Sequence, residues 1–248
     1  MSGHSKWSQI KHKKALTDAK KSKVFSKLAR LISVAARQKG GDQNTNPQLR
    51  IIAEKARSLN MPNENIERAI KRGTGEIEGG KIEEITLEAY GPEGIALIIE
   101  AVTDNKNRTI SEIKFLLSQH GGKMAEIGSV NWLFEKKGVI YVDSTNESNN
   151  QKGKEELELT AIEAGAQDLK WSDETMLEIY TRLEDFEKTK EEIGLKNIKI
   201  ESSAPESVPK SEIKVENEKS KEQIKKLLEA LDENDDVNEI YSNYREQI

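Results

Sequence analysis

The sequence contains no cysteine among its 248 residues. This absence excludes a disulfide framework, thiolate metal ligands and thiol catalysis, and it fits a reducing compartment. Long apolar runs are missing too, since no stretch approaches the ~18 residues of a membrane helix. Residues 24–36 are the most apolar stretch near the N-terminus, but Lys27 and Arg30 interrupt them, unlike the core of a signal peptide. We therefore expect a cytoplasmic protein without a membrane partner.

Histidine is scarce, and no arrangement typical of catalysis or metal binding is present. The three histidines, at positions 4, 12 and 120, lack the HExxH spacing, and no close carboxylate pair completes a metal site. The glycine-rich segment HGGKMAEIGS follows an expected helix and lacks the GK[ST] ending of a phosphate loop. The sequence therefore predicts no metal, no cofactor and no enzymatic activity.

The net charge of -5 conceals a strong separation of charge along the chain. Residues 1–78 hold 17 Lys and Arg against 7 Asp and Glu, whereas residues 79–248 hold 22 against 37. Residues 1–39 alone hold 11 bases and one acid. Such asymmetry favours a polyanionic partner for the basic end, although a solvated lysine-rich face is the simpler alternative.

The basic segment, residues 1–78, which we call the basic end, is predicted to form three helices. Apolar residues from Val24 to Ala35 follow helical spacing, and Gly40-Gly41 ends that segment. Asn46-Pro47 is a start signal for a second helix, which Pro62 interrupts. A short third helix follows, with Gly73 as its expected stop. A helix-turn-helix is a weaker interpretation of the same pattern.

After Gly79 the spacing of apolar residues predicts strands and helices that alternate along the chain. The segment 85–89 alternates, GPEG turns the chain, and IALIIEAV suits a buried strand. A capped helix follows in TDNKNRTISEIKFLLSQHGG, and SVNWLFEKKGVIYV is expected to form two strands about a KKG turn.

The remaining segments fit a βαββαβ order, the ferredoxin-like pattern. Its elements are a strand over 138–143, a helix over 154–164, strands at DLKW and TMLEIYTR, a helix over 184–193 and a strand at NIKIES. By composition SSAPESVPK is a linker. The last helix, residues 218–232, and the strand VNEIYS remain without partners in this unit. We expect them to return to the first α/β section.

Several segments together resemble the YebC family, which includes bacterial proteins long labelled transcriptional regulators and mitochondrial translational activators of cytochrome c oxidase. They are GHSKWSQIKHKKALTDAKKSKVFSKL, NPQLRIIAEKARSLNMPNENIERAIKRGTGE, EAYGPEGIALIIEAVTDNKNRT, HGGKM and WLFEKKG. The resemblance implies an α+β fold in which an N-terminal three-helix bundle precedes two α/β domains, the third (ferredoxin-like) domain being inserted into the second. We set the basic domain at residues 1–78, the discontinuous domain at 79–137 plus 205–248, and the inserted domain at 138–204.

The lysines and the tryptophan near the N-terminus suit phosphate neutralisation and base stacking. The resemblance adds the ribosome as partner, because the family is linked to forming difficult peptide bonds at consecutive prolines. The predicted RNA contacts of this arm are His4, Lys6, Trp7, Lys11, His12, Lys13 and Lys14. The predicted phosphate contacts of the first helix are Lys20, Lys21, Lys23, Lys27 and Arg30.

Three points stay open at this stage. Trp7 is either a base contact or an anchor against the bundle. The helix start Asn105, Lys106, Asn107 and Arg108 is either an anion site or a simple cap. The leading hypothesis is a non-enzymatic translation factor that binds ribosomal RNA, with tRNA as a further partner. The alternative is a DNA-binding transcriptional regulator, although lysine suits phosphate better than base edges.

Overall fold

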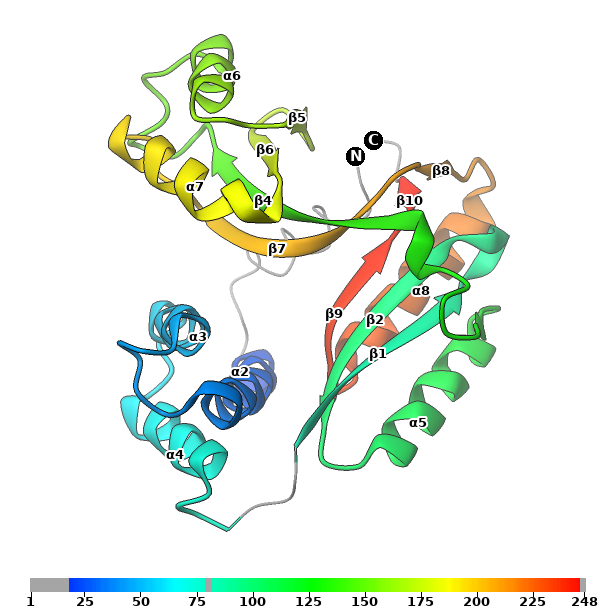
Figure 1. Cartoon of the computed structure of the whole chain (residues 1–248). Helices are drawn as coiled ribbons and strands as arrows, with labels where there is room; N and C mark the ends of the chain where they lie inside the picture. The colour runs from blue at the N-terminus through cyan, green and yellow to red at the C-terminus, as the bar shows by residue number, and fades with distance from the viewer. Residues whose placement is uncertain (1–17, 79–81, 246–248) are drawn as a thin grey trace. The chain divides into compact units, whose positions relative to one another are not determined.

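The structure is a computed structural model that describes residues 18–78 and 82–245 (Figure 1). The described residues divide into two compact units. One consists of residues 18–127 with 222–240, and the other of residues 128–221 with 241–245. The helices of residues 18–78 and the first sheet belong to the same unit. This division does not test the predicted boundaries of three domains, which stay a prediction.

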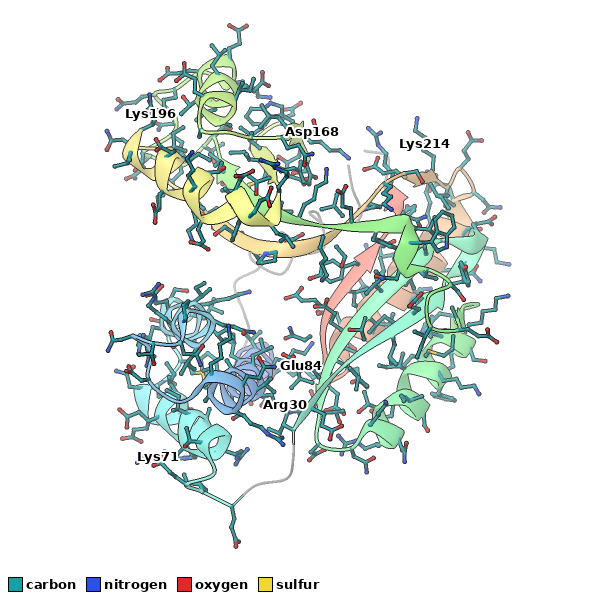
Figure 2. All side chains as sticks on the ribbon, viewed as in Figure 1. Arg30, Lys71, Glu84, Asp168, Lys196 and Lys214 are labelled. Carbon is teal, nitrogen blue, oxygen red and sulfur yellow. The ribbon has the colours of Figure 1, made fainter. Side chains whose placement is uncertain are left out.

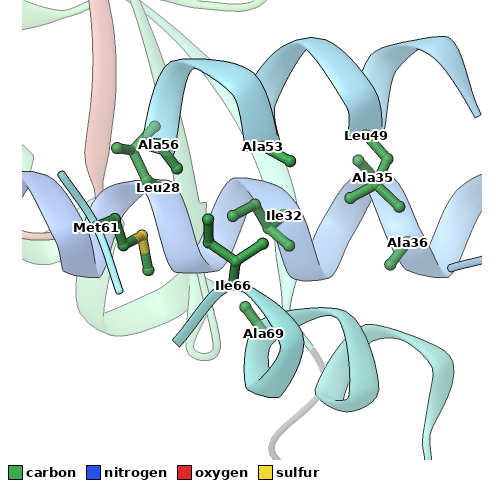
Figure 3. Packing of buried hydrophobic residues seen from close by; sticks show 10 residues of the cluster. All are labelled: Leu28, Ile32, Ala35, Ala36, Leu49, Ala53, Ala56, Met61, Ile66 and Ala69. Carbon is green, nitrogen blue, oxygen red and sulfur yellow. The ribbon is translucent and has the colours of Figure 1, made fainter. Parts of the chain in front are cut away.

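Three helices form the basic end: α2 (Asp18–Lys39), α3 (Pro47–Ser58) and α4 (Asn63–Thr74). Their inward side chains repeat at three and four residues, so each helix buries one apolar stripe. Figure 3 shows these side chains in the space between the helices. Ile32, Leu49 and Ala53 are fully buried there. The expected helical bundle is therefore present.

Asn46 joins two of these helices with its side chain. Its Oδ1 accepts a hydrogen bond from the Leu49 amide at 3.1 Å, which caps α3. Its Nδ2 donates to the Ala35 and Gly40 carbonyls at 2.8 and 2.9 Å, which satisfies acceptors at the end of α2. Because Asn46 is fully buried, each of these bonds replaces one that water would otherwise make.

The expected stop of α4 at Gly73 is wrong. The helix continues to Thr74, and Gly75 takes the left-handed conformation (φ 82°) that ends it. Gly73 serves another purpose, because a Cβ placed there would lie 2.3 Å from the Ser33 carbonyl oxygen and 2.8 Å from the Ala36 Cβ. Glycine thus permits the close approach of α4 to α2.

The first sheet has the strand order β3-β1-β2-β9. Strands β1 (Glu83–Tyr90) and β2 (Ala96–Thr103) are antiparallel and joined through η1 (Pro92–Gly94). Helix α5 (Lys106–Gln119) contacts both strands and leads to β3 (Lys123–Met124). Helix α8 (Glu218–Glu233) precedes β9 (Val237–Ser242), which lies beside β2. The C-terminal strand thus returns to a sheet that begins more than a hundred residues earlier.

The second sheet has the order β5-β6-β4-β7, with every neighbouring pair antiparallel. It contains, in chain order, β4 (Phe134–Asp143), α6 (Lys154–Glu163), β5 (Asp168–Trp171), β6 (Met176–Thr181), α7 (Phe186–Leu195) and β7 (Ser202–Pro209). Short 3₁₀ turns, η2 (Asn131–Leu133) and η3 (Leu183–Asp185), precede β4 and α7. This order is the ferredoxin-like arrangement that the sequence predicts. Strands β8 (Ile213–Lys214) and β10 (Tyr244–Arg245) form a separate parallel pair.

The expected KKG turn is wrong, because β4 runs unbroken through Gly138. A Cβ at Gly138 would lie 2.3 Å from the Phe186 ring and 2.4 Å from the Thr181 hydroxyl oxygen. The residue is therefore small to admit its neighbours rather than to turn the chain.

The linker expected at SSAPESVPK is also wrong, since these residues form β7. Its pairing with β4 runs from Tyr141↔Ser202 to Phe134↔Pro209. Prolines lack the amide that a central strand must donate, but β7 is an edge strand and tolerates them. The strand expected at NIKIES is displaced accordingly, because β7 begins only at Ser202.

We predict that Gly73→Ala destabilises the helical bundle. The added methyl group must displace the Ser33 carbonyl or the Ala36 side chain, which costs about 1–3 kcal/mol of overpacking. A lower urea midpoint of unfolding is the expected measurement.

Gly194→Ala in α7 is the matched control, since a Cβ there meets nothing within 4 Å. The control is expected to leave the midpoint unchanged or slightly higher, because alanine favours helix by up to about 1 kcal/mol. Equal midpoints for Gly73→Ala and wild type would contradict the close approach.

Candidate nucleic-acid interface

The predicted RNA contacts of the arm, His4, Lys6, Trp7, Lys11, His12, Lys13 and Lys14, lie outside the described residues. The side chains of Lys20 and Lys21 lie outside them as well. These assignments therefore stay predictions, as does the choice between base contact and anchor for Trp7. Among the predicted contacts, the first whose side chain is described is Lys23.

Lys23, Lys27 and Arg30 form one face of α2, and this face contacts the C-terminal end of α8. Lys23 donates to the Glu233 carbonyl, Lys27 to the Asp232 carbonyl at 2.6 Å and Arg30 to the Asp235 carbonyl. The last carbonyls of a helix lack partners and carry partial negative charge, so cations are favourable there. The three predicted phosphate contacts thus have protein partners in the structure.

Carboxylates reinforce this contact. The Lys27 ammonium lies 3.7 Å from Asp232, and the Arg30 guanidinium lies 2.8 Å from Asp236. Lys27 is only 8% exposed, so little of it is available to a ligand. The acidic residues of the run Asp232–Asp236 could have indicated a contact with cations. The sequence contained nothing to identify α2 as the source of those cations.

Asp236 collects several donors although its side chain is only 4% exposed. Besides Arg30, it accepts hydrogen bonds from Thr109 at 2.6 Å, Arg108 at 2.7 Å and Thr103 at 3.1 Å. Burial on its own would raise the pKa of Asp236. The hydrogen bonds and the Arg30 charge outweigh burial and bring that pKa below its ordinary value of 3.8. The carboxylate is therefore held ionised.

The helix start at Asn105–Arg108 is a cap in the structure. Asn105 Oδ1 accepts a hydrogen bond from the Arg108 amide at 3.1 Å. The Arg108 guanidinium is engaged by Asp236 and, at 3.0 Å, by Asp104, and the Asp236 hydrogen bond is the main reason that the pKa of Arg108 is raised. Lys106 and Asn107 are exposed at the rim of a shallow depression that Glu83 and Asp104 also line. Those two carboxylates disfavour a phosphate at this point.

A second group of cations, on α3, α4 and the end of α2, faces solvent. Figure 2 labels one of them, Lys71, at the outside of the bundle. All are exposed, and among residues 18–78 and 82–245 none forms an ion pair; they are Lys39, Arg50, Lys55, Arg68, Lys71 and Arg72. The sequence prediction concentrated on α2 and missed this group, which we call the bundle cations. The sequence pattern that could have identified the bundle cations is the placement of Lys and Arg on the side of each helix opposite its apolar stripe.

Two further properties of the described residues bear on chemistry. No group of three or more His, Asp or Glu there is arranged to hold a metal ion. None of the described helices combines the length and apolar character needed to cross a bilayer.

We predict that Asp236→Asn lowers the free energy of unfolding at pH 7 by about 1–3 kcal/mol, because buried donors lose their charged acceptor. A lowered pKa contributes stability above the unfolded value, and this contribution disappears as pH falls through the folded value. The difference between variant and wild type should therefore shrink below about pH 4. Thermal unfolding at several pH values measures it.

Asp235→Asn is the neighbouring control. Its carboxylate is 62% exposed and lies 4.0 Å from Lys23, so we expect a loss below about 1 kcal/mol. Equal losses for the two variants at pH 7 would contradict the role of Asp236.

Known proteins similar to this chain agree with the fold. A crystal structure of a conserved hypothetical protein from Aquifex aeolicus superposes with a TM-score of 0.87 at 43% identity and covers 98% of each chain. The N-terminal bundle, the α/β sections and the predicted α+β class are thereby confirmed.

Relatives named probable transcriptional regulatory proteins match over nearly the whole length. The protein from Halothermothrix orenii is 48% identical over 98% of this chain and 95% of its own. The one from Pseudothermotoga lettingae is 49% identical over 98% and 94%. Residues 5–76 match the model of the TACO1/YebC protein N-terminal domain, and residues 82–244 match that of the TACO1/YebC second and third domain. The resemblance seen in the sequence is confirmed, and the chain belongs to the TACO1/YebC family.

Proposed function

We propose that this protein is a non-enzymatic regulator of gene expression that acts by binding nucleic acid with its basic N-terminal third. The names of its relatives support a regulatory role. The observation that carries the proposal is the charge of residues 1–78, 17 bases against 7 acids. Among the described residues, the contact between α2 and α8 engages three of these bases, and the bundle cations form no ion pair and are exposed to solvent.

The proposed partner is ribosomal RNA, and the proposed role is to help the ribosome through proline-rich stretches. Lysine predominates in the arm and the first helix, and lysine neutralises phosphate as a point charge without reading base edges. The bundle cations extend this surface on two further helices. Such a surface suits a folded RNA, in which phosphates approach from several directions.

Transcriptional regulation through duplex DNA is the second candidate, and the relatives' names favour it. A DNA-reading helix needs its polar face free for the major groove. On α2 the face with Lys23, Lys27 and Arg30 contacts α8, so it is not free in this structure. This observation weighs against α2 as a DNA-reading helix.

Two assays on the purified protein separate the candidates. One is co-sedimentation with ribosomes, and the other is binding to duplex DNA at physiological salt. The translation proposal expects sedimentation, and it expects DNA binding that falls steeply with salt and varies little with sequence. Tight binding to one promoter with a large preference over random DNA would favour transcription instead.

We predict that Lys71→Ala with Arg72→Ala weakens binding to RNA and reduces its salt dependence. Each lost phosphate contact should lower the slope of log affinity against log salt by about 0.7. Fluorescence anisotropy of a labelled RNA at several salt concentrations measures this slope.

Lys188→Ala on α7 is the control, because Lys188 is an exposed lysine in the acidic part of the chain. An unchanged slope in the double variant, or an equal change in Lys188→Ala, would remove the bundle cations from the interface.

We further predict that Trp7→Ala with Lys6→Ala impairs synthesis of proline-rich stretches and leaves the fold intact. Loss of one stacked base costs about 1–3 kcal/mol of binding free energy. In vitro translation of a polyproline reporter measures the effect, and thermal unfolding tests the fold. If the melting temperature falls, or if polyproline synthesis is untouched, the arm is structural.

A further inference from the structure

The ferredoxin-like section carries large apolar side chains on the outer surface of its helices. Leu159 and Ile162 of α6 are 60% and 57% exposed, and Leu195 at the end of α7 is 75% exposed. Single exposed aliphatic residues are ordinary on a protein surface, but several on adjoining helices indicate an interaction site.

Helix α6 carries apolar side chains on its outer side as well as toward the core. Leu157 and Ala161 face the core and are each 1% exposed. Leu159 and Ile162 lie on the opposite side of the helix, away from that core. A surface helix normally keeps its outer side polar. The outer side of α6 therefore presents two aliphatic side chains among the exposed carboxylates of Glu155, Glu156 and Glu163.

An ion pair joins the residue that follows α7 to the last residue of α6. The Lys196 ammonium lies 3.6 Å from the Glu163 carboxylate, and Figure 2 labels Lys196 beyond the end of α7. Glu163 follows Ile162, and Lys196 follows Leu195, so the ends of the two helices that carry these apolar residues lie close together. We call Leu159, Ile162 and Leu195 the outer patch.

The surroundings of the outer patch are acidic. Residues 154–196 hold 13 Asp and Glu against 6 Lys and Arg. Glu155 lies on the same side of α6 as Leu159, and Glu191 is exposed on α7. This field repels the phosphates of nucleic acid and of anionic lipids and attracts a cationic partner.

We infer that the outer patch docks a lysine- or arginine-rich protein segment that presents apolar side chains to Leu159, Ile162 and Leu195. The inference rests on the proposed function, and the partner is then a basic protein of the ribosome rather than its RNA. The chain would hold RNA by its basic end and protein by its acidic section. Two linked contacts raise the overall affinity above that of either one alone.

The test uses a photoreactive p-benzoylphenylalanine at position 159 and purified ribosomes as the probe. Illumination is expected to crosslink the chain to a basic ribosomal protein, with the product identified by mass spectrometry. The same amino acid at position 115 is the matched control, because Phe115 is 61% exposed on α5, outside the outer patch. The control is expected to give no crosslink to that protein.

Serine variants provide the second measurement. Leu159→Ser with Ile162→Ser should weaken ribosome binding at least about tenfold, since burial of two aliphatic side chains is lost. The melting temperature should stay unchanged because both side chains are exposed. Phe115→Ser is expected to leave ribosome binding unchanged.

The outcomes separate this inference from the proposed function. Absence of co-sedimentation with ribosomes overturns both. Co-sedimentation with no crosslink from position 159, or with a crosslink to RNA or to a second copy of this chain, overturns the docking inference alone. Undiminished ribosome binding by the serine double variant does the same.

Discussion

The hydrogen bonds and ion pairs of the buried Asp236 carboxylate hold together α2, the end of β2 and the start of α5. It stands just before β9, and its partners come from α2, from the end of β2 and from the start of α5. A carboxylate this deeply buried is costly unless cations and hydroxyls surround it, and here both do. One residue near the C-terminus therefore fixes segments that are more than a hundred residues away.

The contact between α2 and α8 divides the cations of the basic end into two kinds. Those on one face of α2 satisfy the carbonyls at the end of α8 and the acidic residues that follow. The bundle cations, on α3, α4 and the end of α2, are exposed to solvent. The positive charge of the described helices is therefore partly structural. A count of lysine and arginine overstates the surface available for binding.

The ferredoxin-like section has the opposite character, with an excess of acid around exposed aliphatic residues. The charge of this section excludes the partner proposed for the basic end, because phosphates are repelled. The basic bundle and the ferredoxin-like section thus differ in surface charge, in keeping with the two proposed partners, an RNA and a basic protein.

The sequence by itself determined the elements whose signals are local. Helical spacing, the Asn46 cap, the strands β1 and β2 and the βαββαβ order were all predictable, because each depends on neighbours along the chain. Only the tertiary structure decided the roles of Gly73, Gly138 and the prolines of β7. From the sequence alone, a glycine predicts a helix end or a turn, because the neighbouring atoms that require a small residue are unknown. Prolines likewise predict a linker, because the sequence does not show that their strand lies at the edge of a sheet. The partners of Lys23, Lys27 and Arg30 were undetermined for the same reason, because contacts between residues two hundred positions apart leave no local pattern.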